Sequence, residues 1–133
     1  MPRHKLELDD DFNFLLFGIC SNAKDYRLAW SINKNLNLHL KREEDISDTN
    51  RFSFFSFDDV ANHVKYFLAS NKSEGNIFVK ELKQMDYLLI TEGSLEYLDE
   101  ENFITKLKNS ETILAAYKLN PEILKAKQHL LFG

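Results

Sequence analysis

The segment from Phe12 to Cys20 constrains the fold more than any other part of the sequence. Beyond Asn13 it is apolar at odd and even positions alike, so a strand here places hydrophobic side chains on both of its faces. The apolar run is far shorter than the ~20 residues that a bilayer-spanning helix needs. The sequence therefore predicts a central strand of a soluble sheet, covered on both sides by other parts of the chain.

The size of the chain fits a single hydrophobic core. It has 133 residues, of which 44% are hydrophobic and 13% aromatic. A chain of this length buries about two-thirds of the surface that its unfolded form exposes, which suffices for a core without a metal or a disulfide. No stretch rich in Pro, Gly or Ser and no internal repeat divides it. We expect one domain over residues 1–133.

Scarce residue types exclude several kinds of site. Four glycines in the whole chain leave no room for a glycine-rich phosphate-binding loop. The single Cys20 cannot form an internal disulfide or a thiolate zinc site, and this cysteine usage fits a reducing cytoplasm. His4, His39, His63 and His129 lack the spacing that puts two metal ligands on one element. We expect no metal, no cofactor and a cytoplasmic location.

The charge balance is mildly acidic, with 17 Lys and Arg against 21 Asp and Glu and a net charge of −4. Nucleic-acid affinity comes mainly from neutralised phosphates, so this balance argues against a dedicated nucleic-acid binder but allows a local basic patch. The basic start of the chain runs into Glu7 and three aspartates without an apolar stretch. We therefore expect no signal peptide and no membrane partner.

A helix is predicted from Asn22 to Asn37. Asn22 is expected to cap it and Asp25 to lie in its first turn, where the helix dipole favours an acidic residue. Apolar residues recur on one side at about 100° per residue, as in a helix packed on a sheet. This apolar side consists of Leu28, Ala29, Ile32 and Leu36.

The same helix is predicted to carry a basic face and an aromatic border. Tyr26 and Trp30 lie beside the basic face, where their rings could stack on a nucleic-acid base or fill a hot spot against another protein. The alternative is an ordinary charged helix surface with Trp30 in the core. The basic face consists of Lys24, Arg27, Ser31 and Lys34.

Further strands are predicted from alternation and β-propensity, with a solvated loop over residues 47–50 and a turn over residues 71–76. Residues 51–57 and 64–70 are expected to pair as a hairpin. A short helix over residues 58–67, capped by Asp58, is the alternative, because periodicity alone does not separate the two. The predicted strands are Leu38–Leu40, Arg51–Phe57, Val64–Ser70, Ile77–Val79, Met85–Thr91 and Thr112–Leu119.

Two helices complete the prediction. Asp99 starts one with Phe103, Ile104 and Leu107 turned inward, and Asn120-Pro121-Glu122 predicts a short terminal helix over residues 123–128. The strand Thr112–Leu119 between them is expected to place Ile113, Ala115, Tyr117 and Leu119 on one face. The fold class is α+β: an antiparallel-dominated mixed sheet with two longer helices and a short C-terminal helix packed mainly on one face.

The segment Val79–Tyr87 resembles the signature of the bacterial IPExxxVDY family. Glu81, Asp86 and Tyr87 match by identity, and Lys80 stands where the family has proline. The family is one in which no catalytic residue is assigned, so the resemblance implies no site chemistry. It extends to Gly18-Ile19, Lys24–Leu28, Trp30, Asn33, Asn71–Ser73 and Leu130–Phe132.

Glu81, Asp86 and Tyr87 have both a catalytic and a structural interpretation. On one continuous strand Glu81 and Asp86 would point to opposite faces and could not act as an acid and base pair, unless the strand breaks between them. The structural interpretation is that Asp86 accepts turn amides or pairs with a lysine while Tyr87 packs in the sheet. Cys20, with no histidine near it in sequence, is expected to be a small buried hydrophobe rather than a nucleophile.

These patterns favour a non-enzymatic cytoplasmic protein that binds another protein or a second copy of itself. The predicted binding surface consists of Lys24, Tyr26, Arg27, Trp30 and Lys34. One alternative is RNA association through the same face, which predicts affinity that falls steeply with salt. The other is an enzyme using the family-motif residues Glu81, Asp86 and Tyr87, which predicts a concave pocket that holds them.

Overall fold

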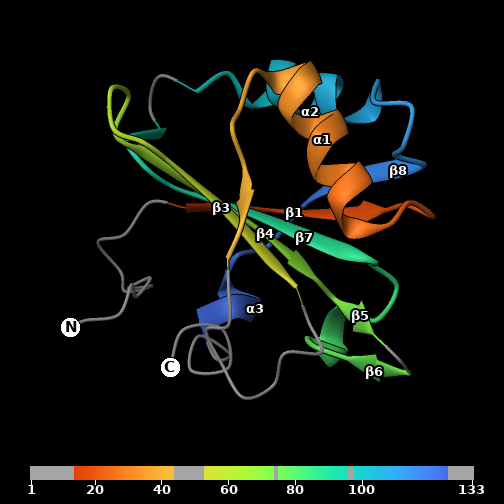
Figure 1. The fold of residues 1–133 in the computed structure, drawn as a ribbon. Helices are drawn as coiled ribbons and strands as arrows, with labels where there is room; N and C mark the ends of the chain where they lie inside the picture. Colours follow the sequence, from red (N-terminus) through yellow and green to blue (C-terminus); the bar gives the residue numbers. More distant parts are fainter. Residues whose placement is uncertain (1–13, 44–52, 74, 96–97, 126–133) are drawn as a thin grey trace.

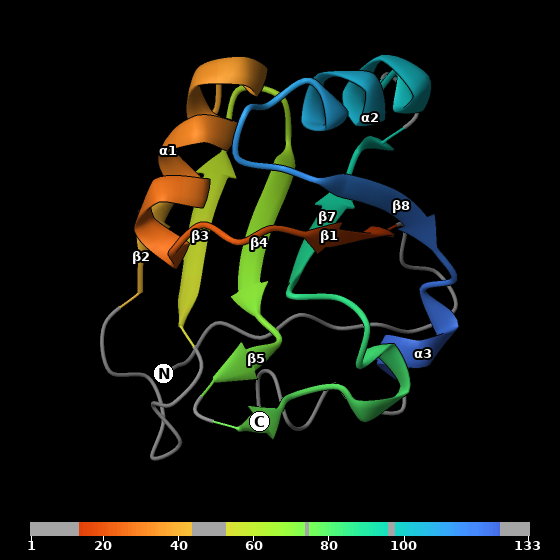
Figure 2. The same cartoon turned by 90° about the vertical axis from the view of Figure 1, so that its right-hand side faces the viewer.

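The main element of the fold is a six-stranded sheet with the strand order β2-β3-β4-β7-β1-β8 (Figures 1 and 2). The structure, a computed structural model, describes residues 14–43, 53–73, 75–95 and 98–125. All five pairings in this sheet are antiparallel, so the α+β class is confirmed but the expected mixed sheet is wrong. Its strands are β1 (Phe14–Cys20), β2 (Lys41–Arg42), β3 (Phe54–Asp59), β4 (Val64–Ser70), β7 (Tyr87–Gly93) and β8 (Ala115–Leu119).

The prediction of an inner strand with two buried faces is confirmed by β1, which lies between β7 and β8. Leu16 and Phe17, neighbours in sequence, are both fully buried and belong to different cores. Gly18 pairs with Tyr117 on one side and Leu88 on the other. A side chain at Gly18 would meet the side chains of Met85 and Leu119, which pack over this position.

Two cores lie on opposite faces of the sheet. The first lies under the helices α1 (Asp25–Leu36) and α2 (Glu100–Lys108), which sit together on one face in Figure 1. The second is covered by the segment with the short 3₁₀ helix η1 (Lys80–Leu82), and Ile123 of α3 (Glu122–Lys125) packs against it. The remainder of the predicted C-terminal helix, residues 126–128, lies outside the described residues.

The helix α1 begins later than predicted. Its N-cap is Lys24, which makes no side-chain cap hydrogen bond, so the prediction that Asn22 caps the helix is wrong. The reason is that residues 21–23 first carry the chain from the sheet to the helix layer, which places Asn22 before the first turn. Asp25 does lie in the first turn, and Asn37 ends the helix in the left-handed conformation at φ 59°.

The hairpin of β3 and β4 is confirmed, and the alternative helix over residues 58–67 is wrong. The predicted strand at Leu38–Leu40 is also wrong, because the Asn33 side chain binds both the amide and the carbonyl of Leu40. Those backbone groups are therefore not available to a strand, and pairing starts at Lys41 in β2. The predicted loop at residues 47–50 lies outside the described residues.

The predicted turn over residues 71–76 contains a small hairpin of β5 (Lys72–Ser73) and β6 (Asn76–Ile77). The predicted strand at Ile77–Val79 is shorter than expected, because the Val79 amide donates to the Asn71 side chain rather than to a strand. The polar break before β7 is the 3₁₀ helix η1.

In the carboxyl-terminal third the helix, strand and helix follow in the predicted order, but some side chains lie on another face of the sheet than predicted. Asp99 caps α2 by accepting from the Asn102 amide, as predicted. The predicted common face of Ile113 and Leu119 is wrong: Ile113 joins the helix-side core, whereas Leu119 packs against the opposite core. Ile113 lies before the strand begins at Ala115, so strand alternation does not apply to it.

No helix in the described part of the chain is long and apolar enough to cross a bilayer.

Candidate functional site

The outward side of α1 exposes two large aromatic rings beside three cations. Tyr26 is 66% exposed and Trp30 59% exposed. The alternative that Trp30 is a core residue is therefore wrong. Lys24, Arg27 and Lys34 are also exposed. We call these five residues the α1 surface.

Ser31 does not belong to this surface, although the helical wheel placed it there. It is 3% exposed, because the segment that follows α2 covers that side of α1. Asn35, one turn further along the same side, donates to the Ser110 hydroxyl at 2.8 Å. The prediction of a four-residue basic face is thus wrong at Ser31.

The cations of the α1 surface are not neutralised by the described carboxylates. The Lys34 Nζ lies 5.1 Å from the centre of the Trp30 ring, a cation–π contact within one turn of helix. The nearby Asp25 instead pairs with Arg42 of β2 at 3.2 Å. Within the described ranges, no ion pair involves Lys24 or Arg27.

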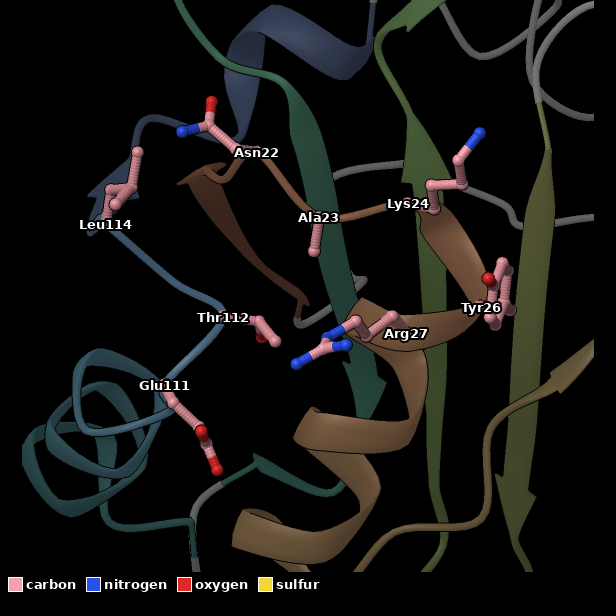
Figure 3. Close-up of a pocket in the computed structure, with 8 residues that line it drawn as sticks. All are labelled: Asn22, Ala23, Lys24, Tyr26, Arg27, Glu111, Thr112 and Leu114. Atoms are coloured by element: carbon pink, nitrogen blue, oxygen red, sulfur yellow. The ribbon is translucent and has the colours of Figure 1, made fainter.

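A shallow hollow of about 540 Å³ adjoins the start of α1 (Figure 3). In Figure 3 the Arg27 guanidinium extends toward Thr112, with Glu111 on the same side. The Thr112 hydroxyl oxygen is buried and has no hydrogen-bond partner among the described residues. Two cationic residues, one carboxylate and Tyr26 thus line one concave region, and in Figure 3 the Tyr26 ring points away from Arg27 and Thr112. The lining residues of the hollow are Asn22, Ala23, Lys24, Tyr26, Arg27, Glu111, Thr112 and Leu114.

Sequence reasoning missed the half of this hollow that comes from residues 111–114. These residues reach α1 because β1 pairs with β8, which brings the end of β1 beside the start of β8. The Ser21 hydroxyl then donates to the Thr112 carbonyl and accepts from the Ala23 amide. Only the strand pairing could have revealed this proximity, since no local motif marks it.

Asp86 and Tyr87 hold the segment that leads into α1. The Asp86 carboxylate accepts from the Ser21 amide at 2.9 Å and pairs with Lys72 at 3.3 Å. The Tyr87 hydroxyl donates to the Ala23 carbonyl at 2.7 Å. Both contacts fall within the three residues that precede Lys24. Asp86 thus binds a backbone amide and a lysine, and Tyr87 binds a backbone carbonyl, which are contacts of the kind that the structural interpretation expects.

Electrostatics agree with structural roles for the groups around this segment. Burial, and then the charges of Asp25 and Asp86, raise the pKa of Tyr87 to about 12, so its hydroxyl stays a donor. Burial and the Asp86 charge raise the pKa of Cys20, which opposes the thiolate form that a nucleophile needs. The Cys20 thiol donates to the Gln84 carbonyl at 3.6 Å.

Asn71 organises the loop over residues 79–86, which contains most of the segment that resembles the IPExxxVDY signature. Its side chain is fully buried and makes three hydrogen bonds to backbone, accepting from the Val79 amide and donating to the carbonyls of Leu82 and Met85. Its own amide donates to the Asp86 carbonyl. One buried side chain thus fixes the path of the chain from Val79 to Asp86.

The three motif residues occupy different surroundings. Glu81 is exposed on η1, whereas Tyr87 is 9% exposed at the start of β7. None of the three lines the hollow beside α1. Within the described residues, no group of three His, Cys, Asp or Glu side chains gathers as metal ligands would.

Comparison with known proteins adds no relative. No family model matches the chain, and a search of curated proteins finds no match.

Proposed function

We propose that the protein is a non-enzymatic binding module whose α1 surface docks on another protein. The observation that carries this proposal is the exposure of Tyr26 and Trp30 beside cations that the described carboxylates leave unpaired. Protein interfaces are enriched in tyrosine, tryptophan and arginine, and these residue types supply most hot spots. The α1 surface contains one residue of each of these types, namely Tyr26, Trp30 and Arg27.

A protein partner is favoured over RNA by the charges around the rings. Glu111 places a carboxylate in the hollow that Lys24 and Arg27 line, which weakens the positive field that phosphates require. The Lys34 ammonium already lies over the Trp30 ring, where a stacked base would compete with it. A partner with apolar and acidic groups fits both features.

A catalytic role for Glu81, Asp86 and Tyr87 has less support. Asp86 and Tyr87 are engaged by Ser21, Lys72 and Ala23, and the hollow beside α1 contains none of the motif residues. We infer that the motif positions the start of α1, which links the resemblance to the IPExxxVDY family with the binding surface. A cytoplasmic location belongs to the same proposal.

Capture from native lysate of the source organism, followed by binding measurements with the purified partner, tests the proposal. We expect Trp30→Ala and the double variant Arg27→Glu, Lys34→Glu each to weaken the affinity for the partner at least tenfold, which is the size of a hot-spot loss. The matched control is the double variant Lys80→Glu, Lys83→Glu, which reverses two exposed cations on the η1 segment, at the opposite face of the sheet from α1. Equal binding by all variants would refute the proposal.

A salt titration separates the two partner classes. Docking on a protein through the aromatic rings and a few cations should weaken only modestly between low and high salt, because the burial of apolar area is not screened. RNA binding should instead weaken steeply, with log affinity linear in log salt. A steep slope together with captured RNA would replace the protein partner by RNA.

A further inference from the structure

The hollow beside α1 contains more positive than negative charge. Lys24 and Arg27 line it together with one carboxylate, that of Glu111. All three side chains are exposed, and within the described residues none of them takes part in an ion pair. The neighbouring Asp25 does not line the hollow and pairs with Arg42 instead. One positive charge of the hollow therefore has no counterpart.

Arg27 is the cation that points into the hollow. In Figure 3 its guanidinium extends toward Thr112, whereas the Lys24 side chain extends away from it. A guanidinium presents a planar fork of N–H donors that matches the two oxygens of a carboxylate. The buried Thr112 hydroxyl has no hydrogen-bond partner among the described residues. Since buried polar groups are as a rule hydrogen-bonded, this hydroxyl is a second reason to expect a polar group at this place.

Exposed apolar side chains border the hollow. Leu114, which lines it, is 67% exposed. Trp30 is 59% exposed and follows Arg27 by three residues on α1, about one helical turn. A free anion would use neither of these apolar groups. A peptide segment that places a carboxylate in the hollow would use both.

We propose that the hollow binds a side-chain carboxylate of the partner protein, with apolar neighbours of that side chain on Leu114 and Trp30. The inference rests on the proposed function, which places a partner on the α1 surface, and adds the chemistry of the docking segment. One uncompensated positive charge matches one carboxylate, and Glu111 disfavours groups of higher negative charge such as phosphates. Arg27 determines this specificity, because its fork can donate to both carboxylate oxygens.

Titration of the isotope-labelled protein with capped peptides, followed by NMR at constant low salt, tests the proposal. The probes are acetyl-Leu-Glu-Ala-Leu-amide and its counterparts with glutamine or lysine in place of glutamate. The glutamate peptide should shift the amide resonances of residues 22–27 and 111–114. It should bind about threefold more tightly than the glutamine peptide, the size of an exposed ion pair, and the lysine peptide should bind most weakly. The net charge of −4 would by itself favour the lysine peptide, so this order is not a general charge effect.

Arg27→Gln should remove the preference for the glutamate peptide. The matched control is Lys83→Gln, at an exposed lysine next to η1, which should retain it. Equal binding of the glutamate and glutamine peptides, or no shift with either, would overturn the proposal. A glutamate preference that survives in Arg27→Gln would also overturn it, because the carboxylate would then bind elsewhere.

Failure of this inference can be told apart from failure of the proposed function. If the peptides show no glutamate preference but Trp30→Ala still weakens the captured partner, the α1 surface docks a protein by another chemistry. If Trp30→Ala leaves the captured partner unaffected, the proposed function fails, whatever the peptides show.

Discussion

At the scale of single residues, Asn71 is the side chain on which the motif loop depends most. We expect Asn71→Ala to lower the free energy of unfolding by about 3 kcal/mol or more, because it leaves one buried amide and two buried carbonyls without their partner. Urea unfolding followed by circular dichroism measures this loss. Asn62→Ala, at an exposed turn residue, should cost less than about 1 kcal/mol. Equal losses would show that the buried bonds contribute nothing.

The raised pKa of Tyr87 predicts that the protein loses stability at alkaline pH. Its pKa is raised to about 12 in the folded protein, above the ordinary value of 10.0, so the folded state holds its proton more tightly. This contribution is fully present below pH 10 and is lost as pH rises toward 12, because the unfolded state releases its proton first.

Chemical unfolding of wild-type protein and Tyr87→Phe between neutral pH and pH 12 tests this. The wild type should lose about 1–3 kcal/mol more than Tyr87→Phe over the alkaline range, since phenylalanine has no proton to release. Parallel pH profiles for the two proteins would contradict the expected shift.

At the scale of single elements, the surface of α1 can be probed through Trp30, the one tryptophan of the chain. At constant ionic strength, and with each quencher normalised to its quenching of free N-acetyltryptophanamide, iodide should quench its fluorescence about twofold better than caesium does, because nearby cations attract the anion. Lys34→Ala should shrink this difference, whereas Lys83→Ala, at an exposed lysine of another segment, should leave it unchanged. Stronger quenching by caesium would show that the α1 surface is not cationic.

The junction between β7 and the turn before β4 gives a second test at this scale. Gly93 has φ 121°, and a Cβ there would collide with the His63 carbonyl oxygen, a backbone atom that cannot move aside. Gly93→Ala should therefore destabilise by about 3 kcal/mol or more. Gly75 has φ 84° but open space around it, so Gly75→Ala should cost only about 1–2 kcal/mol. Equal losses of stability in the two variants would show that the positive φ alone sets the cost, and not the collision with the His63 carbonyl.

At the scale of the whole molecule, periodic sequence patterns predicted the helices and strands better than they predicted the contacts between distant segments. The two-sided apolar run of β1, the hairpin of β3 and β4 and the Asp99 cap follow from local rules and are present. The errors have different causes: a distant segment covers Ser31, the nearby Asn33 side chain binds the Leu40 backbone, and Asn22 lies in the connection before α1. The hollow beside α1 was missed because residues 111–114 reach it only through the pairing of β1 with β8.

The two cores should unfold together, because both are built on β1 and β7. Leu16→Ala changes the core opposite the helices, where Leu16 is fully buried, and should lower the free energy of unfolding by about 2–5 kcal/mol. Trp30 lies on α1, on the other side of the sheet. In a two-state transition its fluorescence must nevertheless report the same loss as circular dichroism.

Leu107→Ala, in the helix-side core, supplies the reciprocal test, and Val60→Ala, at an exposed residue, should cost less than about 0.5 kcal/mol. For each variant the midpoints from Trp30 fluorescence and from circular dichroism should coincide. If Leu16→Ala shifted circular dichroism but left the Trp30 transition in place, the helix layer would unfold independently of the sheet. The α1 surface would then rest on a separate unit, and the bonds from Asp86 and Tyr87 would not couple it to the sheet.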